Sequence, residues 1–197
     1  MQSVFDGYGV DLELPDLNAP SFSRLTISAM LARLDQLFGA DAQDRVSFIG
    51  SSMGGYLAAR WAELNPDRVG RLLLLCPGFG LNHRWPDLIG RDAFATWQKT
   101  GWHPFPNGAG IPEDVHFGLI DDAMDHPTYP KVPCPTVIIH GAQDEIVPVE
   151  SSKTYVQHYP EVELEIVDDD HRLTESIELI ATTAITCLGI SEGLGLP

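Results

Sequence analysis

The chain has 197 residues, which suits one domain with a sizeable core, and its 44% hydrophobic and 20% charged residues are typical of a globular protein. Its formal net charge is −16. Because so acidic a chain repels phosphate backbones and acidic membrane surfaces, we expect neither nucleic acid nor a membrane as a partner. The first residues do not resemble a secretory signal, and no apolar run is long enough to span a bilayer, so we expect a cytoplasmic protein.

Five elements are predicted in the first half of the chain. Apolar and polar residues alternate over residues 10–14, the pattern of a half-exposed strand. A helix follows, whose apolar face runs from Ile27 to Phe38. Residues 45–50 form a buried strand and residues 54–64 a helix. The continuous apolar run over residues 72–76 is typical of a central parallel strand.

The second half begins with an aromatic-rich segment, residues 77–135, that lacks a regular period. A buried strand is then predicted over residues 136–140, and a helix that starts at Ser151 or Ser152. Alternation over residues 162–167 indicates a strand near a sheet edge. A closing helix covers residues 174–188, with a cap at Thr174-Glu175-Ser176.

Strands that alternate with helices predict an α/β fold, a mostly parallel sheet with helices on both faces. We expect one domain over residues 1–197, with residues 77–135 as a cap insertion. An excess of aromatic residues beside a polar site is typical of an apolar pocket, so we predict that Trp97 and Trp102 bind substrate. The alternative is a packed segment with no contact to substrate.

Residues 50–54, Gly-Ser-Ser-Met-Gly, match the pattern Gly-x-Ser-x-Gly. The pattern alone is weak, but here it follows a predicted buried strand and opens a predicted helix. That setting is the sharp turn that exposes a nucleophilic serine, and we expect Gly50 and Gly54 to avoid Cβ clashes where backbone segments come close. Ser52 is therefore the candidate nucleophile.

A serine hydroxyl needs a base to take its proton, and in this type of fold an acid and then a histidine follow the serine along the chain. Asp144 follows the predicted strand over residues 136–140, at the sheet edge where doubly wound sheets place their sites. Glu145 is the competing acid. His171 follows the next predicted strand, after three consecutive aspartates, and is the candidate base.

The other six histidines show no tight metal-ligand spacing, so no metal site is predicted. His140 precedes Gly141 at a strand end, where we expect it to shape the acid loop. The three cysteines, far apart in the sequence, are expected to be buried free thiols.

Taken together, residues 50–55, 140–148 and 170–171 resemble the α/β-hydrolase superfamily, and the size resembles its small bacterial esterases, the YqiA/YcfP-like proteins. Residues 12–17 are similar to the strand and Pro-Asp loop that precede the elbow in that group. The resemblance implies hydrolysis of a carboxylic ester or thioester, without a metal or organic cofactor.

The chain departs from the superfamily's pattern at its beginning. Members carry an earlier strand ending in His-Gly, and the loop after that strand gives the second N–H of the oxyanion hole. Met53 N–H is the only such donor that we can place here. We therefore expect an α/β-hydrolase fold that lacks its N-terminal strands, with an open strand edge that favours a homo-oligomer.

The predicted function is acyl transfer on a small-molecule ester or thioester, through an acyl-enzyme on Ser52. Two alternatives stay open. One is amide or C–C bond hydrolysis on the same scaffold, because fold does not settle chemistry. The other is a truncated or degenerate hydrolase that binds a ligand without catalysis.

Overall fold

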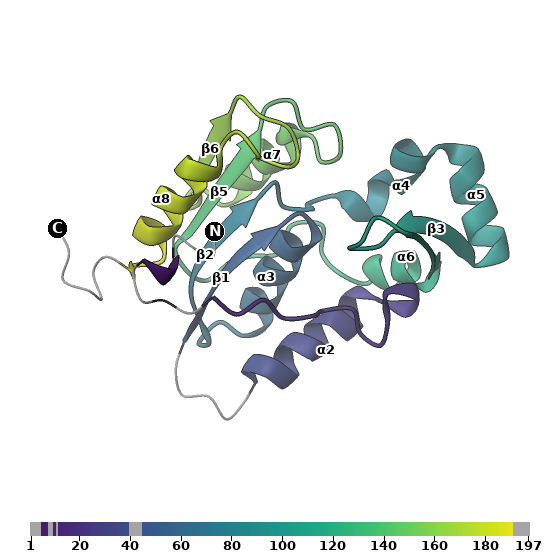
Figure 1. Ribbon diagram of the computed structural model, residues 1–197, viewed down its shortest axis with the longest axis horizontal. Coiled ribbons are helices and arrows are strands. Elements are labelled where there is room, and N and C mark those ends of the chain that lie inside the picture. Colours follow the sequence, from purple (N-terminus) through teal and green to yellow (C-terminus); the bar gives the residue numbers. More distant parts are fainter. Residues whose placement is uncertain (1–4, 8–9, 11, 40–44, 191–197) are drawn as a thin grey trace. The chain divides into compact units, whose positions relative to one another are not determined.

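A computed structural model of the chain describes residues 5–7, 10, 12–39 and 45–190 (Figure 1). The chain forms two compact units. The first comprises Met1–Leu14, Gln43–Phe79 and Tyr129–Pro197, and the second comprises Pro15–Ala42 and Gly80–Thr128. The predicted insertion over residues 77–135 thus overlaps the second unit, which also takes in a stretch that precedes the sheet in the sequence.

The first unit is built on a four-stranded sheet in which every neighbouring pair is parallel. Its strands are β1 (Val46–Ser51), β2 (Val69–Leu75), β5 (Thr136–Gly141) and β6 (Glu163–Val167), which lie in that order across the sheet. Each was predicted within three residues at either end. In the described part of the chain β1 is an edge strand, and self-association through this edge stays a prediction.

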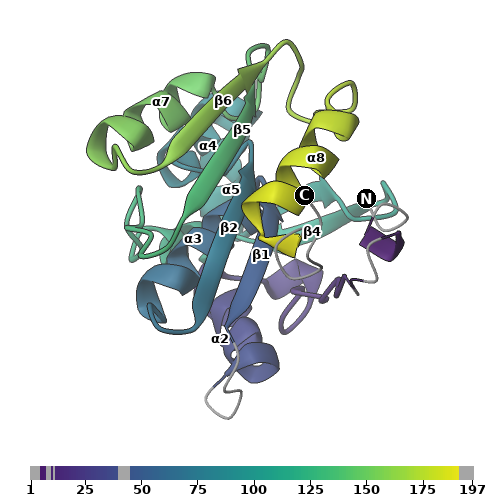
Figure 2. The same ribbon diagram turned by 90° about the vertical axis from the view of Figure 1, so that its left-hand side faces the viewer.

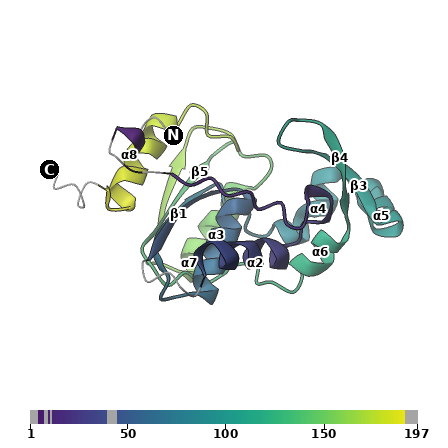
Figure 3. The same ribbon diagram turned by 60° about the horizontal axis from the view of Figure 1, so that its bottom comes forward.

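Helices cover both faces of this sheet (Figures 2 and 3). Helices α3 (Met53–Leu64) and α7 (Val149–His158) lie on one face, and α8 (Ile177–Cys187) lies on the other. The predicted fold class, a mostly parallel sheet with helices on both faces, is confirmed. None of the helices in the described ranges combines the length and the apolarity needed to cross a membrane.

Each face of the sheet has its own apolar core, because successive strand residues point to opposite faces. On the α8 face, Leu73 and Ile139 pack with Ile180 and with Phe5 from the start of the chain, all at most 4% exposed. On the α3 face, the rings of Phe48 and Trp61 meet edge to face at 5.5 Å. Burying a side chain of this size contributes about 1.5–3 kcal/mol to stability.

The first strand predicted in this unit does not form, and one of its helices begins earlier than predicted. Val10 and residues 12–14 belong to no strand, while Asp11 lies outside the described residues. Val10 and Leu12 instead pack against the core of the α8 face from an irregular segment, and this packing produces the same alternation in the sequence. Helix α7 begins at Val149 rather than at Ser151 or Ser152, directly after Pro148.

The second unit contains more regular structure than the sequence indicated. Only its helix α2 (Ile27–Phe38) was predicted, and it forms as expected. The sequence did not predict the short elements of this unit. Each has less than three turns of helix or only a few residues of strand, which is too short for a regular period of apolar residues to be recognised. They are η1 (Phe22–Arg24), α4 (Leu81–Ile89), α5 (Arg91–Thr100), β3 (Trp102–Pro106), β4 (Pro112–His116) and α6 (Gly118–Ala123), with β3 and β4 antiparallel.

The core of the second unit is an aromatic cluster around Trp97. This side chain is completely buried, and its indole N–H donates to the carbonyl of Val115 at 2.8 Å. Rings of neighbouring residues surround it at centroid distances of 5.1–6.4 Å; they are Trp85, Phe94, Phe105 and Phe117. Trp97 thus has no exposed surface to offer a substrate, and we assign it to the core. Trp102 is 37% exposed, and its predicted contact with substrate stays a prediction.

Candidate active site

The carboxyl ends of all four strands meet at one edge of the sheet of the first unit. The register pairs Ser51 with Leu75, Leu75 with Ile139, and Gly141 with Val167. Because the strands are parallel and end level with one another, the residues that follow them converge. The predicted nucleophile, acid and base all lie at this edge.

Ser52 occupies the turn between β1 and α3, in a strained backbone conformation with φ 52° and ψ −120°. Its N–H donates to the carbonyl of Leu75 and its carbonyl accepts from the N–H of Gly78, so both backbone groups are bonded. Such a conformation persists only where the surroundings enforce it.

Close packing behind the turn depends on two glycines. A Cβ on Gly50 would lie 2.5 Å from the carbonyl oxygen of Gly54, and one on Gly55 would lie 2.9 Å from the carbonyl oxygen of Gly50. A Cβ on Gly54 would meet nothing within 4 Å. The expectation that Gly54 avoids a clash is therefore wrong, and Gly55, outside the Gly-x-Ser-x-Gly pattern, takes that role.

The hydroxyl of Ser52 is free for chemistry because it does not cap the helix it precedes. At the start of α2, Thr26 shows the usual arrangement, in which its Oγ1 accepts from the N–H of Ala29 at 3.1 Å. Ser52 occupies the same position before α3, yet its side chain makes no capping bond. Its Oγ lies 3.0 Å from Nε2 of His171.

Asp144 lies in the loop between β5 and α7, with a completely buried side chain. Its Oδ1 accepts from the N–H groups of Ile146 and Val147 at 2.9 and 2.8 Å, and its Oδ2 lies 2.6 Å from Nδ1 of His171. The neighbouring Glu145 is exposed. The structure thus brings Asp144, His171 and Ser52 into one hydrogen-bonded chain.

Burial by itself would raise the pKa of Asp144, since it disfavours the charged form. The hydrogen bonds from His171 and from the N–H of Val147 more than offset burial and hold the pKa below its usual value. Asp144 is therefore a carboxylate at neutral pH. A carboxylate only accepts hydrogen bonds, so Nδ1 of His171 carries the proton and Nε2 can accept the hydroxyl of Ser52.

The loop that carries His171 is held by Asp169, a residue that no sequence pattern distinguishes from the aspartates on either side. Asp169 Oδ1 accepts from the N–H of Asp170 at 2.8 Å, and its Oδ2 accepts from the N–H of Glu175 at 3.0 Å and the hydroxyl of Ser176 at 2.8 Å. Although burial opposes the charge, these bonds hold the pKa of Asp169 below its usual value.

The predicted start of the last helix, at Thr174, is wrong. Helix α8 begins at Ile177, and Ser176 gives its hydroxyl to Asp169 rather than capping the helix. Two further contacts tie the histidine loop to the acid loop. The backbone N–H of Gln143 donates to the carbonyl of Asp169 at 3.0 Å, and a Cβ on Gly141 would lie only 2.4 Å from the carbonyl oxygen of Asp170.

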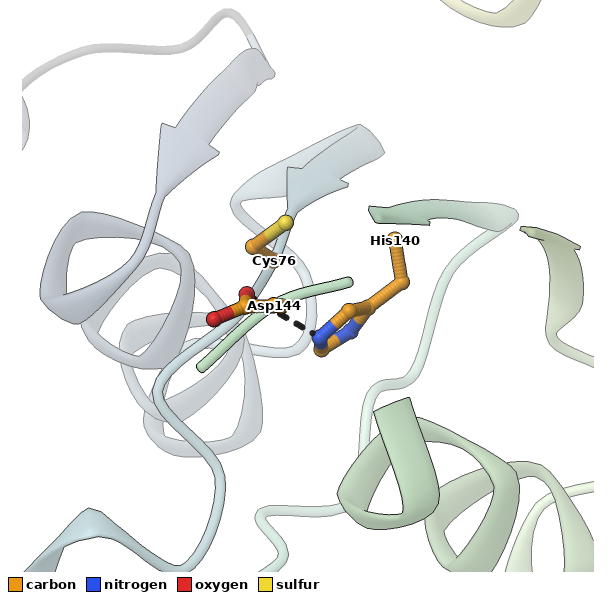
Figure 4. A group of neighbouring side chains, drawn as sticks. All are labelled: Cys76, His140 and Asp144. Atoms are coloured by element: carbon orange, nitrogen blue, oxygen red, sulfur yellow. Dashed lines mark ion pairs between the residues drawn. The ribbon is translucent and has the colours of Figure 1, made fainter. Parts of the chain in front are cut away.

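Behind the acid, Cys76, which directly follows β2, and His140, which belongs to β5, approach Asp144 (Figure 4). These three buried residues offer sulfur, nitrogen and oxygen atoms within 4.8 Å of one another, the donor set of a small metal site. Their protonation does not suit a metal. Burial raises the pKa of the Cys76 thiol to about 12, and Nε2 of His140 faces the carbonyl of Val147, so both atoms carry protons.

A parallel sheet with helices on both faces, and a strand–serine–helix turn at its carboxyl edge, define an α/β hydrolase fold. Solved structures of this class superpose on the chain. Est1E from Butyrivibrio proteoclasticus does so with a TM-score of 0.63 at 20% identity, over 86% of this chain and 70% of that one. The mouse alpha/beta hydrolase domain-containing protein 10 has a TM-score of 0.58 at 22% identity, over 81% and 68% of the two chains.

The chain belongs to the uncharacterised protein family UPF0227, whose sequence profile matches residues 1–184. It is also 25% identical, over 185 residues, to a 2-hydroxy-6-oxononadienedioate/2-hydroxy-6-oxononatrienedioate hydrolase of Dechloromonas aromatica (strain RCB). That match covers 77% of this chain and 63% of the relative, so the chain spans less than two thirds of the relative's length. The resemblance to the α/β-hydrolase superfamily is confirmed.

The packing of the turn predicts opposite outcomes for two glycines of one motif. Gly50→Ala should lower the melting temperature, because its Cβ collides with backbone that cannot move aside without distorting the turn. Gly54→Ala meets open space in the first turn of α3, and replacing glycine by alanine at a compatible backbone position stabilises by about 0.4–1 kcal/mol, so its melting temperature should stay the same or rise. Thermal unfolding of both variants beside the wild type measures this, and equal losses in both would contradict the packing argument.

Asp169 predicts a pH-dependent contribution to stability. Its pKa is lowered on folding, so the stabilisation is complete above its unfolded value of 3.8 and is lost as pH falls through the lower folded value. Asp169→Asn cannot accept hydrogen bonds at both side-chain positions and should unfold at a lower temperature at neutral pH.

The difference in melting temperature between the wild type and Asp169→Asn should shrink below about pH 4. Asp168→Asn, at an exposed position next to it, serves as the matched control. A difference that stays constant from pH 7 down to the lowest pH at which both proteins fold would rule out the charge of Asp169 as the cause.

Proposed function

We propose that this protein is a serine hydrolase that cleaves a carboxylic ester or thioester through an acyl-enzyme on Ser52. The observation that carries the proposal is the hydrogen-bonded chain from Ser52 Oγ through His171 to Asp144, with separations of 3.0 and 2.6 Å. These distances match the reach required of a nucleophile, its base and the group that orients the base. The strained turn that presents Ser52 supports the same reading.

In the proposed cycle, Nε2 of His171 takes the hydroxyl proton while Ser52 Oγ attacks the carbonyl carbon. Asp144 stabilises the imidazolium that forms. The proton then passes from Nε2 to the leaving alcohol or thiol, and the acyl group stays on Ser52. Water, activated by His171 in the same way, attacks this acyl-enzyme and regenerates the serine.

The negative charge that develops on the carbonyl oxygen needs hydrogen-bond donors. Met53 is the first residue of α3, and the first intrahelical bond at this end runs from the N–H of Tyr56 to the carbonyl of Ser52. A helix leaves its first amides without an internal acceptor. We therefore assign the N–H of Met53 to the oxyanion hole, where the helix dipole adds to the stabilisation.

A second candidate function is hydrolysis of a C–C bond. The Dechloromonas relative is named for a substrate that carries a ketone and two carboxylate groups. The same serine and base could attack a ketone carbonyl, in which case the proton from His171 goes to a carbon leaving group. A panel that pairs aryl esters and acyl thioesters with a 2-hydroxy-6-oxo dienedioate separates the two functions, with Ser52→Ala as the blank for each.

If Ser52, Asp144 and His171 form a catalytic triad, substitutions at and beside it should lower turnover to different degrees. Ser52→Ala should abolish turnover and labelling by a fluorophosphonate, while its thermal unfolding stays close to that of the wild type. Asp144→Asn should lower kcat by about 10⁴-fold, because the amide favours the wrong tautomer of His171. Glu145→Gln changes the exposed neighbour and is the matched control, with near wild-type kcat.

Steady-state hydrolysis of one aryl ester measures all three variants. Full turnover in Ser52→Ala would remove Ser52 as the nucleophile, and a larger loss in Glu145→Gln than in Asp144→Asn would reassign the acid. A wild-type protein that neither turns over any member of the panel nor reacts with the fluorophosphonate would favour the non-catalytic binding protein.

A further inference from the structure

The carboxylate of Asp144 faces a second histidine. His140 belongs to β5 and its side chain is completely buried, and its Nε2 lies 3.3 Å from Oδ2 of Asp144. This is the same oxygen that contacts Nδ1 of His171. Two imidazoles therefore share one carboxylate oxygen, one of them next to the nucleophile and the other enclosed in the core.

The partners of His140 fix where its proton lies. Nε2 is 2.8 Å from the carbonyl oxygen of Val147, which can only accept, so Nε2 carries a proton. Burial, despite the nearby carboxylate, holds the pKa of His140 below its usual value, so the ring is neutral. Nδ1 then accepts from the hydroxyl of Ser152 at 2.8 Å. His140 is a donor locked in one orientation, with its N–H shared between Val147 and Asp144.

The backbone of Val147 contacts both Asp144 and His140. Its N–H donates to Oδ1 of Asp144 and its carbonyl accepts from His140. The imidazole therefore supports the acid loop and the acid at once. Without the N–H of His140, less of the negative charge on Oδ2 of Asp144 would be compensated. The carboxylate would then stabilise the protonated form of His171 more strongly.

We propose that His140 is a positioning residue, which holds Oδ2 of Asp144 in line with His171 and limits how strongly that carboxylate favours the imidazolium form of His171. The inference rests on the proposed function, since it concerns the same triad. His140 becomes a fourth side chain beside the triad, with a measurable effect on the pH dependence of the base, His171.

Two further titratable side chains, Cys76 and Glu150, act on Asp144 or on His140. Cys76, after β2, donates its thiol to Asp144, and its raised pKa keeps it neutral over the range in which a histidine titrates. Glu150, in α7, interacts with His140 electrostatically and is exposed. His171 and His140 repel each other when charged, which favours the neutral form of His140.

Two amide substitutions separate positioning from packing. In His140→Gln the side-chain N–H₂ can reach the place of Nε2 and donate to both Val147 and Asp144. In His140→Asn the shorter amide stays near the place of Nδ1, beside Ser152, and leaves Oδ2 without this donor. Ser152→Ala is the control for destabilisation, since it removes a hydrogen bond from the buried ring but keeps the donor to Asp144.

The measurement is kcat and KM for one aryl ester from pH 5 to pH 9, with the melting temperature of each variant. For His140→Asn we expect the midpoint of the acid limb of kcat/KM to rise by about half a pH unit or more, and kcat to fall about tenfold at unchanged KM. His140→Gln should restore the midpoint. Ser152→Ala should lower the melting temperature without moving the midpoint.

Nuclear magnetic resonance of the histidine ring nitrogens in the wild type needs no substitution. His140 should stay neutral, with its proton on Nε2, throughout the titration of His171. A charged His140, or a proton on its Nδ1, would overturn the proposal, as would a His140→Asn variant that loses stability but keeps the wild-type midpoint. Turnover that survives Ser52→Ala would instead remove the proposed function, and the titration of His171 in His140→Asn would still test the contact.

Discussion

The requirement to compensate one buried negative charge organises the catalytic edge of this protein. The side chain of Asp144 is fully enclosed, and an unpaired carboxylate in such a place would take up a proton or destabilise the fold. Backbone amides of its own loop satisfy one oxygen, two histidines contact the other, and the thiol of Cys76 donates to the same carboxylate. The loop conformation and the proton on Nδ1 of His171 both follow from this constraint, whereas burial keeps His140 neutral despite the carboxylate.

The three members of the triad could be predicted from the sequence because they depend on chain order and strand ends alone. Ser52, Asp144 and His171 each follow a strand that an apolar run or a regular alternation reveals in the sequence, and parallel strands bring their carboxyl ends together. The residues that hold the triad could not be found in this way. Asp169 and Ser176 meet only because the histidine loop folds back on itself, and Cys76 reads in sequence as the end of an apolar strand.

Composition was a weaker guide to the aromatic segment, because the same residues serve a pocket or a core. Trp97 is enclosed by other rings, whereas Trp102 presents part of its surface to solvent. At the ends of the segment, Phe79 and Tyr129 pack with Tyr155 in the core of the first unit. Burial depends on contacts between residues distant in the sequence, and an excess of aromatic residues carries no information about it.

The backbone of Ser52 has a thermodynamic consequence of its own. A non-glycine residue with a positive φ of this kind carries about 1–3 kcal/mol of strain, which a glycine at the same position would relieve. The surrounding packing of β1, α3 and their glycines supplies the free energy that holds the serine in place. At position 52 stability and reactivity therefore make opposite demands. The turn favours glycine, whereas the reaction requires the hydroxyl of serine.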